Sequence, residues 1–145
     1  MPIFQFHKDH TIPSGDWVWV FGSNDLGVHG AGAAKIARSN FRAQLGQGVG
    51  LTGDAYGIVT RAGYRTPDMR ELKFRTLPLV VISKHIAAFI EFAKAHPQMN
   101  FFVTRVACEL AGYSDATIAP LFRSAPSNCS FANEWMQYLS RQEAA

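Results

Sequence analysis

Trp17-Val18-Trp19-Val20-Phe21, followed directly by Gly22-Ser23-Asn24-Asp25, is the stretch of sequence that decides the fold. An unbroken run of β-branched and aromatic residues is typical of a strand covered on both faces, so we expect a central strand here. Glycines follow closely, at Gly27, Gly30 and Gly32. A helical pattern then runs from Ala33 to about Leu45. The segment therefore predicts a strand, a glycine-rich turn and a helix in succession.

Strands and helices alternate along the rest of the chain. Further strands are expected at residues 3–6, 56–60, 100–106 and 129–131. Helices are expected from 79 or 83 to 96, from 114 or 115 to 121, and from 134 to 139. The basic segment 61–75 is interpreted as a loop. This alternation predicts a three-layer α/β/α fold with a mixed, largely parallel central sheet.

Length and composition set the broad class. A chain of 145 residues with 48% apolar residues is expected to form one domain, residues 1–145. It contains neither a membrane-length apolar stretch nor a signal-peptide pattern, so the expected location is the cytoplasm, without membrane partners. Cys108 and Cys129 lack the spacing of a zinc or redox site and are expected to be buried thiols. No metal cluster is visible, so neither a metal nor another cofactor is predicted.

The positive charge is concentrated in one segment. The formal net charge is +3, and segment 61–75 alone holds five basic residues against Asp68 and Glu71. This placement argues against a broad nucleic-acid-binding face, which needs basic residues along a whole surface. It leaves room for a local loop that attracts anions.

The glycine-rich turn is suited to an anion. Backbone N–H groups at a helix N-terminus, with the positive end of the helix dipole behind them, form a site for phosphate. Neither a P-loop nor the spaced Rossmann fingerprint is present. The alternative is a tight turn that packs the helix on the strand. A second cluster, residues 46–53, suggests backbone in left-handed conformations or in close contact with something, because glycine there costs conformational entropy.

The order of these motifs resembles a macrodomain, a module that binds ADP-ribose and in some members removes it. Segment 23–34 resembles its asparagine- and glycine-rich first loop, segment 50–60 the approach to its next strand, and segment 102–113 its late strand and second phosphate loop. The chain is also similar to uncharacterised bacterial and phage proteins that share Phe-Gly-Ser-Asn, His-Gly-Ala-Gly-Ala-Ala and a late Ala-Gly motif. It departs from macrodomains in lacking the Gly-Asp-Ile/Leu-Thr stretch and in carrying Cys108-Glu109-Leu110 in the late loop.

The resemblance implies binding of ADP-ribose or a related NAD-derived nucleotide, with hydrolysis of an ADP-ribosyl linkage as a further expectation. Phosphates would lie on the backbone of residues 27–32 and 110–113. The residues expected to bind the ligand are Ser23, Asn24, Gly27, Gly30, Gly32, Gly50, Thr60, Arg105, Gly112 and Tyr113. An ADP-ribosylated protein is a conceivable partner. The alternative is a phage or bacterial module that sequesters a nucleotide signal without turnover.

Individual side chains have competing interpretations. Asn24 either binds ribose, as the corresponding macrodomain asparagine does, or forms an Asx-turn. His29 is the candidate acid/base, since its ordinary pKa suits proton transfer at neutral pH, and it could equally be a surface histidine. Asp25 could activate a water molecule or simply belong to a turn. Arg105 and Glu109 are expected to form a structural ion pair rather than to take part in catalysis.

Overall fold

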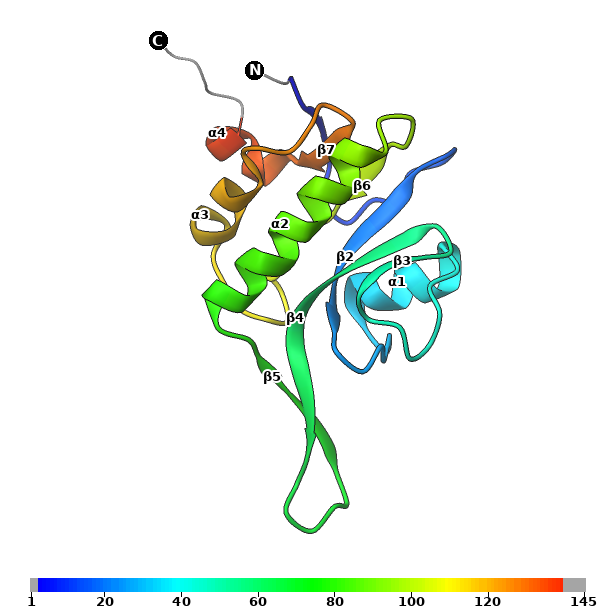
Figure 1. Cartoon of the computed structure of the whole chain (residues 1–145), viewed down its shortest axis with the longest axis vertical. Coiled ribbons are helices and arrows are strands. Elements are labelled where there is room, and N and C mark those ends of the chain that lie inside the picture. Colours follow the sequence, from blue (N-terminus) through cyan, green and yellow to red (C-terminus); the bar gives the residue numbers. More distant parts are fainter. Residues whose placement is uncertain (1–2, 140–145) are drawn as a thin grey trace.

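The computed structural model describes residues 3–139, in which seven strands form one mixed sheet (Figure 1). The strands are β1 (Gln5–His7), β2 (Val18–Asn24), β3 (Gly50–Thr52), β4 (Ala55–Arg65), β5 (Leu72–Thr76), β6 (Phe101–Val103) and β7 (Cys129–Ala132). They lie in the order β1-β7-β6-β2-β4-β3, and β5 also pairs with β4. The adjacent strands β1, β7, β6, β2 and β4 are parallel to one another, whereas β3 and β5 run antiparallel to β4.

Helices cover both faces of this sheet. The α-helices are α1 (Gly32–Asn40), α2 (Leu79–Ala95), α3 (Asp115–Ile118) and α4 (Met136–Leu139), and two short 3₁₀ segments occupy Ala119–Phe122 and Asn133–Trp135. α1 lies on one face, and α2, α3 and α4 lie on the other (Figure 1). As expected, Ser114 caps α3, because its side chain accepts from the Thr117 N–H. The three-layer α/β/α fold with a mixed, largely parallel sheet is therefore confirmed.

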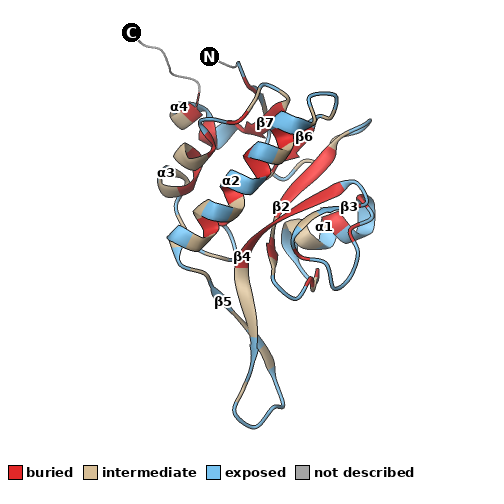
Figure 2. Ribbon diagram, in the orientation of Figure 1, coloured by how far each residue is buried: buried red, intermediate tan, exposed pale blue. Residues whose placement is uncertain are grey.

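The central strand β2 is buried on both faces, as its apolar run predicts (Figure 2). Val18 and Val20 belong to the core under α2, whereas Trp19 and Phe21 belong to the core under α1. Trp19 stacks between Phe41 and Phe102 at ring distances of 5.1 and 5.4 Å. Burying an aromatic or branched side chain contributes roughly 1.5–3 kcal/mol, so this strand supplies much of the stabilisation of both layers.

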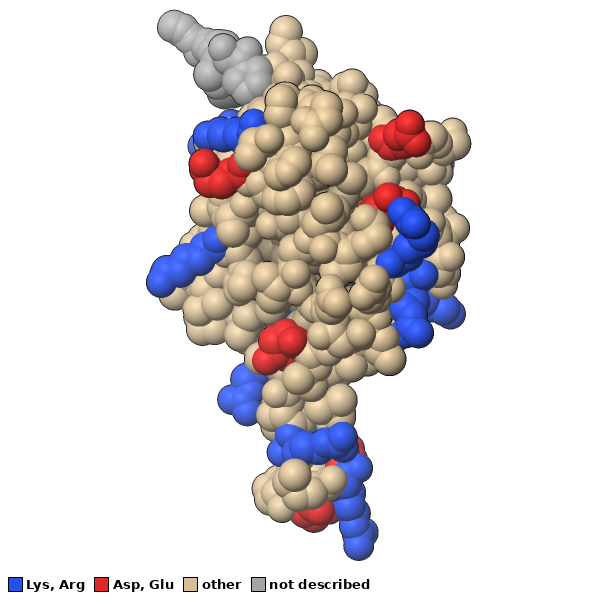
Figure 3. Space-filling view, turned by 45° about the vertical axis from the view of Figure 1, so that its right-hand side comes forward, with Lys and Arg blue, Asp and Glu red and all other residues tan. Residues whose placement is uncertain are grey.

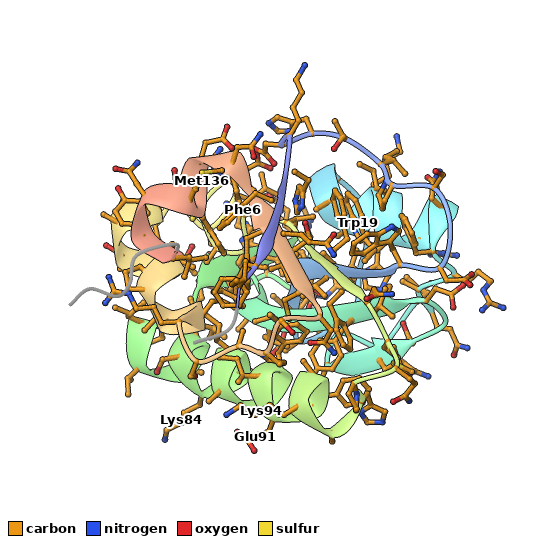
Figure 4. The ribbon with its side chains drawn as sticks, turned by 90° about the horizontal axis from the view of Figure 1, so that it is seen from above. Phe6, Trp19, Lys84, Glu91, Lys94 and Met136 are labelled. Carbon is orange, nitrogen blue, oxygen red and sulfur yellow. The ribbon has the colours of Figure 1, made fainter. Side chains whose placement is uncertain are left out.

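α2 confirms the amphipathic pattern seen in the sequence. Its buried residues are Ile82, Ile86, Phe89, Ile90 and Ala93. Lys84, Glu91 and Lys94 project from the opposite face, away from the sheet (Figure 4). The three- and four-residue spacing thus places every buried side chain on the face that packs against the sheet.

Several boundaries differ from the sequence expectation. β2 continues through Gly22 to Asn24, because these residues pair with β4. α1 ends at Asn40 rather than near Leu45, and Arg42 has a left-handed φ of 60° that a helix cannot accommodate. The strand expected at 100–106 is limited to Phe101–Val103. The expected strand at 3–6 is shifted to Gln5–His7 and lies at the end of the strand order.

The interpretation of segment 61–75 as a loop is wrong. β4 and β5 form an antiparallel hairpin with Arg61 opposite Thr76 and Arg65 opposite Leu72. The hairpin projects beyond the rest of the molecule, and Lys and Arg side chains gather over it (Figures 1 and 3). The guanidinium of Arg75 lies 4.4 Å from the centre of the Tyr64 ring, a contact between facing strands that local sequence patterns do not indicate.

Both cysteines are free thiols. Cys129 is buried and Cys108 is half-buried. Burial is the main cause that raises the pKa of each thiol to about 12, so both are protonated at neutral pH. The expectation of a buried thiol is confirmed for Cys129, whereas Cys108 is only partly buried. None of the helices in residues 3–139 has the length and apolar character needed to cross a bilayer.

Candidate functional site

A cavity of about 390 Å³ opens where β1, β2 and β6 end. Its walls come from stretches far apart in the chain: residues 7–11 after β1, the end of β2 with the start of α1, Thr60 and Arg61 of β4, and residues 104–111 after β6. Ligands in sheets of this kind bind beyond the carboxyl ends of parallel strands. The cavity is therefore at the edge of the sheet where the sequence predicts a site.

The N-terminus of α1 forms one wall. Its N-cap, Ala31, offers no side chain to the helix, and the first turn contains no acidic residue. Within residues 3–139, the N–H groups of Gly32, Ala33 and Ala34 have no hydrogen-bond acceptor. Gly30, Ala31 and these three residues all line the cavity. Unsatisfied amides at the positive end of a nine-residue helix can hold an anion, as the sequence predicts.

Hydrogen bonds hold the preceding loop in shape. The amide of Asn24 donates to the Val28 carbonyl at 2.8 Å and accepts from the Val28 N–H at 3.0 Å. The Ser23 hydroxyl donates to the Gly48 carbonyl, and the Thr60 hydroxyl donates to the Ser23 carbonyl at 3.2 Å. Ser23, Asn24 and Thr60 line the cavity, yet their polar groups are already engaged within the protein. The local turn is thus the role of Asn24 that these contacts favour.

The loop after β6 forms the opposite wall. Thr104 is fixed by two bonds to the Val20 carbonyl, from its N–H at 3.0 Å and its hydroxyl at 2.7 Å. Ala107 then takes a left-handed φ of 67° and accepts from the Tyr113 N–H. The Tyr113 hydroxyl donates to the Leu77 carbonyl at 2.8 Å. Gly112 and Tyr113 therefore shape this loop, but neither lines the cavity.

Arg105 is neutralised by carboxylates. It donates two hydrogen bonds to Asp115, at 2.9 and 2.7 Å, and one to Asp9 at 3.2 Å. These bonds, first of all that with Asp115, raise the pKa of Arg105. The expected partner was Glu109, and that is wrong: Glu109 lies 3.3 Å from His10 instead. Arg105 lines the cavity, but its charge is balanced within the protein.

The two candidate catalytic residues lie outside the cavity lining. His29 is buried edge-on against Phe21, and its Nε2 donates to the Gln44 carbonyl at 3.1 Å. Asp25 is exposed, and its carboxylate accepts from the Gly63 N–H at 2.8 Å. Both side chains make contacts that hold the first loop against neighbouring segments. Their catalytic roles remain sequence predictions.

Gly27 and Gly48 pack the two glycine clusters on each other, whereas a Cβ at Gly50 would meet nothing within 4 Å. A Cβ at Gly27 would lie 2.2 Å from the Gln47 nitrogen, and one at Gly48 would lie 1.8 Å from the Asn24 oxygen. Gly50 starts β3 and pairs with Gly57. The close contact suggested for residues 46–53 is therefore contact with the protein's own first loop.

Sequence reasoning missed His7 and Arg61 as cavity residues. The His7 ring stacks on Phe102 at 3.6 Å, and its Nδ1 lies 2.7 Å from the Ser130 hydroxyl. Burial lowers the pKa of His7 to about 4, so the ring is neutral at physiological pH. The signal that could have found His7 was its position at the end of a parallel strand, but that strand was expected to stop at Phe6.

Asp9, His10 and Glu109 come together at the rim of the cavity, with one ligand atom of each within 4.8 Å of the others. The sequence predicts no metal here. His10 is 72% exposed, and the Asp9 oxygen nearest to it also accepts from Arg105. His10 thus contacts two carboxylates, those of Asp9 and Glu109, at the rim.

The chain is similar to known proteins in structure, at low sequence identity. No protein-family model matches the sequence, and no curated protein matches it. A protein of unknown function from Bacteroides thetaiotaomicron is similar in structure, with a TM-score of 0.52, 16% identity and coverage of 90% of this chain and 98% of that one. A second protein from that organism has a TM-score of 0.49, 17% identity and coverage of 90% and 99%. A macrodomain protein from Streptomyces coelicolor has a TM-score of 0.43, 17% identity and coverage of 90% and 98%.

Proposed function

We propose that the cavity binds a phosphate-bearing nucleotide of the ADP-ribose type. The observation that carries this proposal is the uncapped N-terminus of α1, whose first-turn N–H groups lack acceptors within residues 3–139 and line the cavity. A phosphate oxygen accepts hydrogen bonds from such groups and is also stabilised by the helix dipole. The ligand's phosphate would therefore lie against Gly30 to Ala34.

The remaining walls suit the rest of such a ligand. Trp19, Phe74 and Phe102 contribute aromatic surface to the same cavity. Pockets for small molecules commonly combine apolar walls with a few fixed polar groups. This combination of an anion site with aromatic walls supports a nucleotide over inorganic phosphate.

Titration calorimetry with ADP-ribose tests the proposal. Ala33→Pro is the informative variant, because it removes one cavity N–H that has no acceptor within the described residues. Proline is tolerated in the first turn of a helix. We expect the wild type to bind and Ala33→Pro to bind about 10-fold more weakly, since one hydrogen bond to a charged group is lost. Unchanged circular dichroism serves as the control for folding. Absence of heat at millimolar ADP-ribose would remove this ligand class.

A second candidate function is sequestration of the nucleotide without turnover. The position of His29 and Asp25 outside the cavity lining favours it, because each side chain is engaged in holding the loop. Incubating the protein with an excess of ADP-ribosyl derivatives and analysing the mixture by mass spectrometry separates the two functions. Appearance of free ADP-ribose would support the hydrolase, whereas recovery of intact ligand alone would support sequestration.

A further inference from the structure

Arg61 differs from Arg105, the other basic residue lining the cavity within residues 3–139. Arg105 is balanced by Asp9 and Asp115, as described above. Arg61 has no carboxylate within ion-pair distance in the described part of the chain, and its Nε is buried without a hydrogen-bond partner. A buried donor without a partner is costly, so natural proteins usually satisfy it. Arg61 is thus a cation without a counter-charge within residues 3–139.

A bulge in β4 places Arg61 beside Thr60 at the cavity. Along β2 and β4 the register passes from Ser23 opposite Val59 to Asn24 opposite Arg61, which leaves Thr60 as an extra residue in β4. In a regular strand, Thr60 and Arg61 would point to opposite faces, but here both line the same cavity. Bulges of this kind re-aim side chains and are common beside functional sites.

An aromatic ring supports the guanidinium of Arg61. Its central carbon lies 5.6 Å from the centre of the Phe74 ring, which supports one face of the group through a cation–π contact. A guanidinium held on an aromatic ring still presents its N–H groups at the edge, where they can bind two oxygens of one anion. Such an edge binds phosphate or carboxylate in the same way.

We propose that Arg61 binds a second anionic group of the ligand, distinct from the phosphate held at the N-terminus of α1. This inference rests on the proposed function and adds to it the residue that binds the second anionic group. A nucleoside diphosphate, or a derivative such as ADP-ribose, places one phosphate at each of the two anion sites, whereas a nucleoside monophosphate leaves Arg61 without its partner. Arg61 is then the residue that discriminates between the two.

Calorimetric titration with ADP and AMP tests the assignment in the wild type, in Arg61→Met and in Arg65→Met. Arg65 lies on the same strand, is exposed and does not line the cavity, so it controls for loss of a positive charge. We expect the wild type and Arg65→Met to bind ADP about 10- to 100-fold more tightly than AMP. Arg61→Met should lose most of this preference through weaker ADP binding, while its affinity for AMP stays within about 3-fold of the wild type.

Thermal unfolding without ligand separates binding from a structural role. Because the Nε of Arg61 has no hydrogen-bond partner in the described part of the chain, Arg61→Met should unfold at the same temperature as the wild type or higher. A lower unfolding temperature together with equal losses of ADP and AMP binding would assign Arg61 to the fold and overturn the inference.

Binding to the wild-type protein alone distinguishes failure of this inference from failure of the proposed function. If it binds ADP-ribose but shows no preference for ADP over AMP, the role of Arg61 is wrong and the proposed function stands. If it binds none of the three nucleotides, the proposed function itself fails. If Arg61→Met does not fold, Arg61→Lys replaces it, and its ADP preference should fall because lysine lacks the planar pair of donors.

Discussion

Asn24 is the residue that closes the first loop, and both ends of its amide are used for this. Replacing it with alanine removes the bonds to the Val28 carbonyl and the Val28 N–H, at 2.8 and 3.0 Å. We expect Asn24→Ala to lower the free energy of unfolding by about 1–3 kcal/mol, because two backbone groups lose their partner. Urea denaturation measures this. Asn133→Ala replaces an exposed asparagine whose side chain makes no hydrogen bond within residues 3–139, and it should change this free energy by less than about 0.5 kcal/mol.

His7 gives the fold a dependence on pH. Its pKa is lowered to about 4 by burial, against an ordinary value of 6.5. Below pH 6.5, His7 binds a proton in the unfolded chain but stays neutral in the folded protein. The free energy of unfolding therefore falls as the pH drops from about 6.5 to about 4. The contribution of this group is at most about 1.4 kcal/mol per pH unit.

The pH effect is measured by urea unfolding at several values between pH 4 and 7. His7→Asn retains a polar atom for the Ser130 hydroxyl but does not titrate in this range. The free energy of unfolding of the variant should depend less steeply on pH than that of the wild type. Parallel curves for the two proteins would show that His7 is not the group responsible.

At the scale of elements, the two glycine clusters pack backbone against backbone. A Cβ at Gly48 would lie 1.8 Å from the Asn24 oxygen, whereas a Cβ at Gly30 would meet nothing within 4 Å. We therefore expect Gly48→Ala to destabilise the protein by about 1–3 kcal/mol or more, since the first loop must move. Gly30→Ala should be neutral or stabilising by up to about 1 kcal/mol, through its effect on the unfolded chain. Guanidinium denaturation compares the pair, and equal losses would contradict this packing.

Elements with strong local signals were predictable, and those fixed by pairing were not. The apolar run of β2 and the spacing of α2 carry their own periodicity, so both were identified. β5 is rich in charged residues, and it is a strand because Leu72 to Thr76 pair with β4. The bulge that places Thr60 and Arg61 in one cavity is likewise a property of two paired strands. Neither the pairing of β5 with β4 nor the bulge can be predicted from the sequence of one segment alone.

At the scale of the whole molecule, the cavity is predictable only in part. The sequence identified the glycine turn before α1 and the loop after β6, because both follow strands of the expected sheet. It could not separate the glycines that line the cavity, Gly30 and Gly32, from Gly27, which packs the two clusters together, and Gly50, which begins β3. His29 and Asp25 were assigned to the site because they lie close to its glycines in the chain. Their side chains instead bond to Gln44 and Gly63, which are distant in sequence.

A ligand that fills the cavity should connect its separate walls, and hydrogen exchange can detect this. In the free protein the N–H groups of Gly32, Ala33 and Ala34 have no acceptor in residues 3–139, so they should exchange quickly. ADP-ribose at 100 times its Kd stabilises the folded state by about 2.7 kcal/mol and should slow exchange in residues 30–34 and 106–111. The end of the hairpin, residues 66–71, does not line the cavity and should be unaffected. Stabilisation without protection at residues 30–34 would place the ligand elsewhere on the molecule and contradict the anion site at α1.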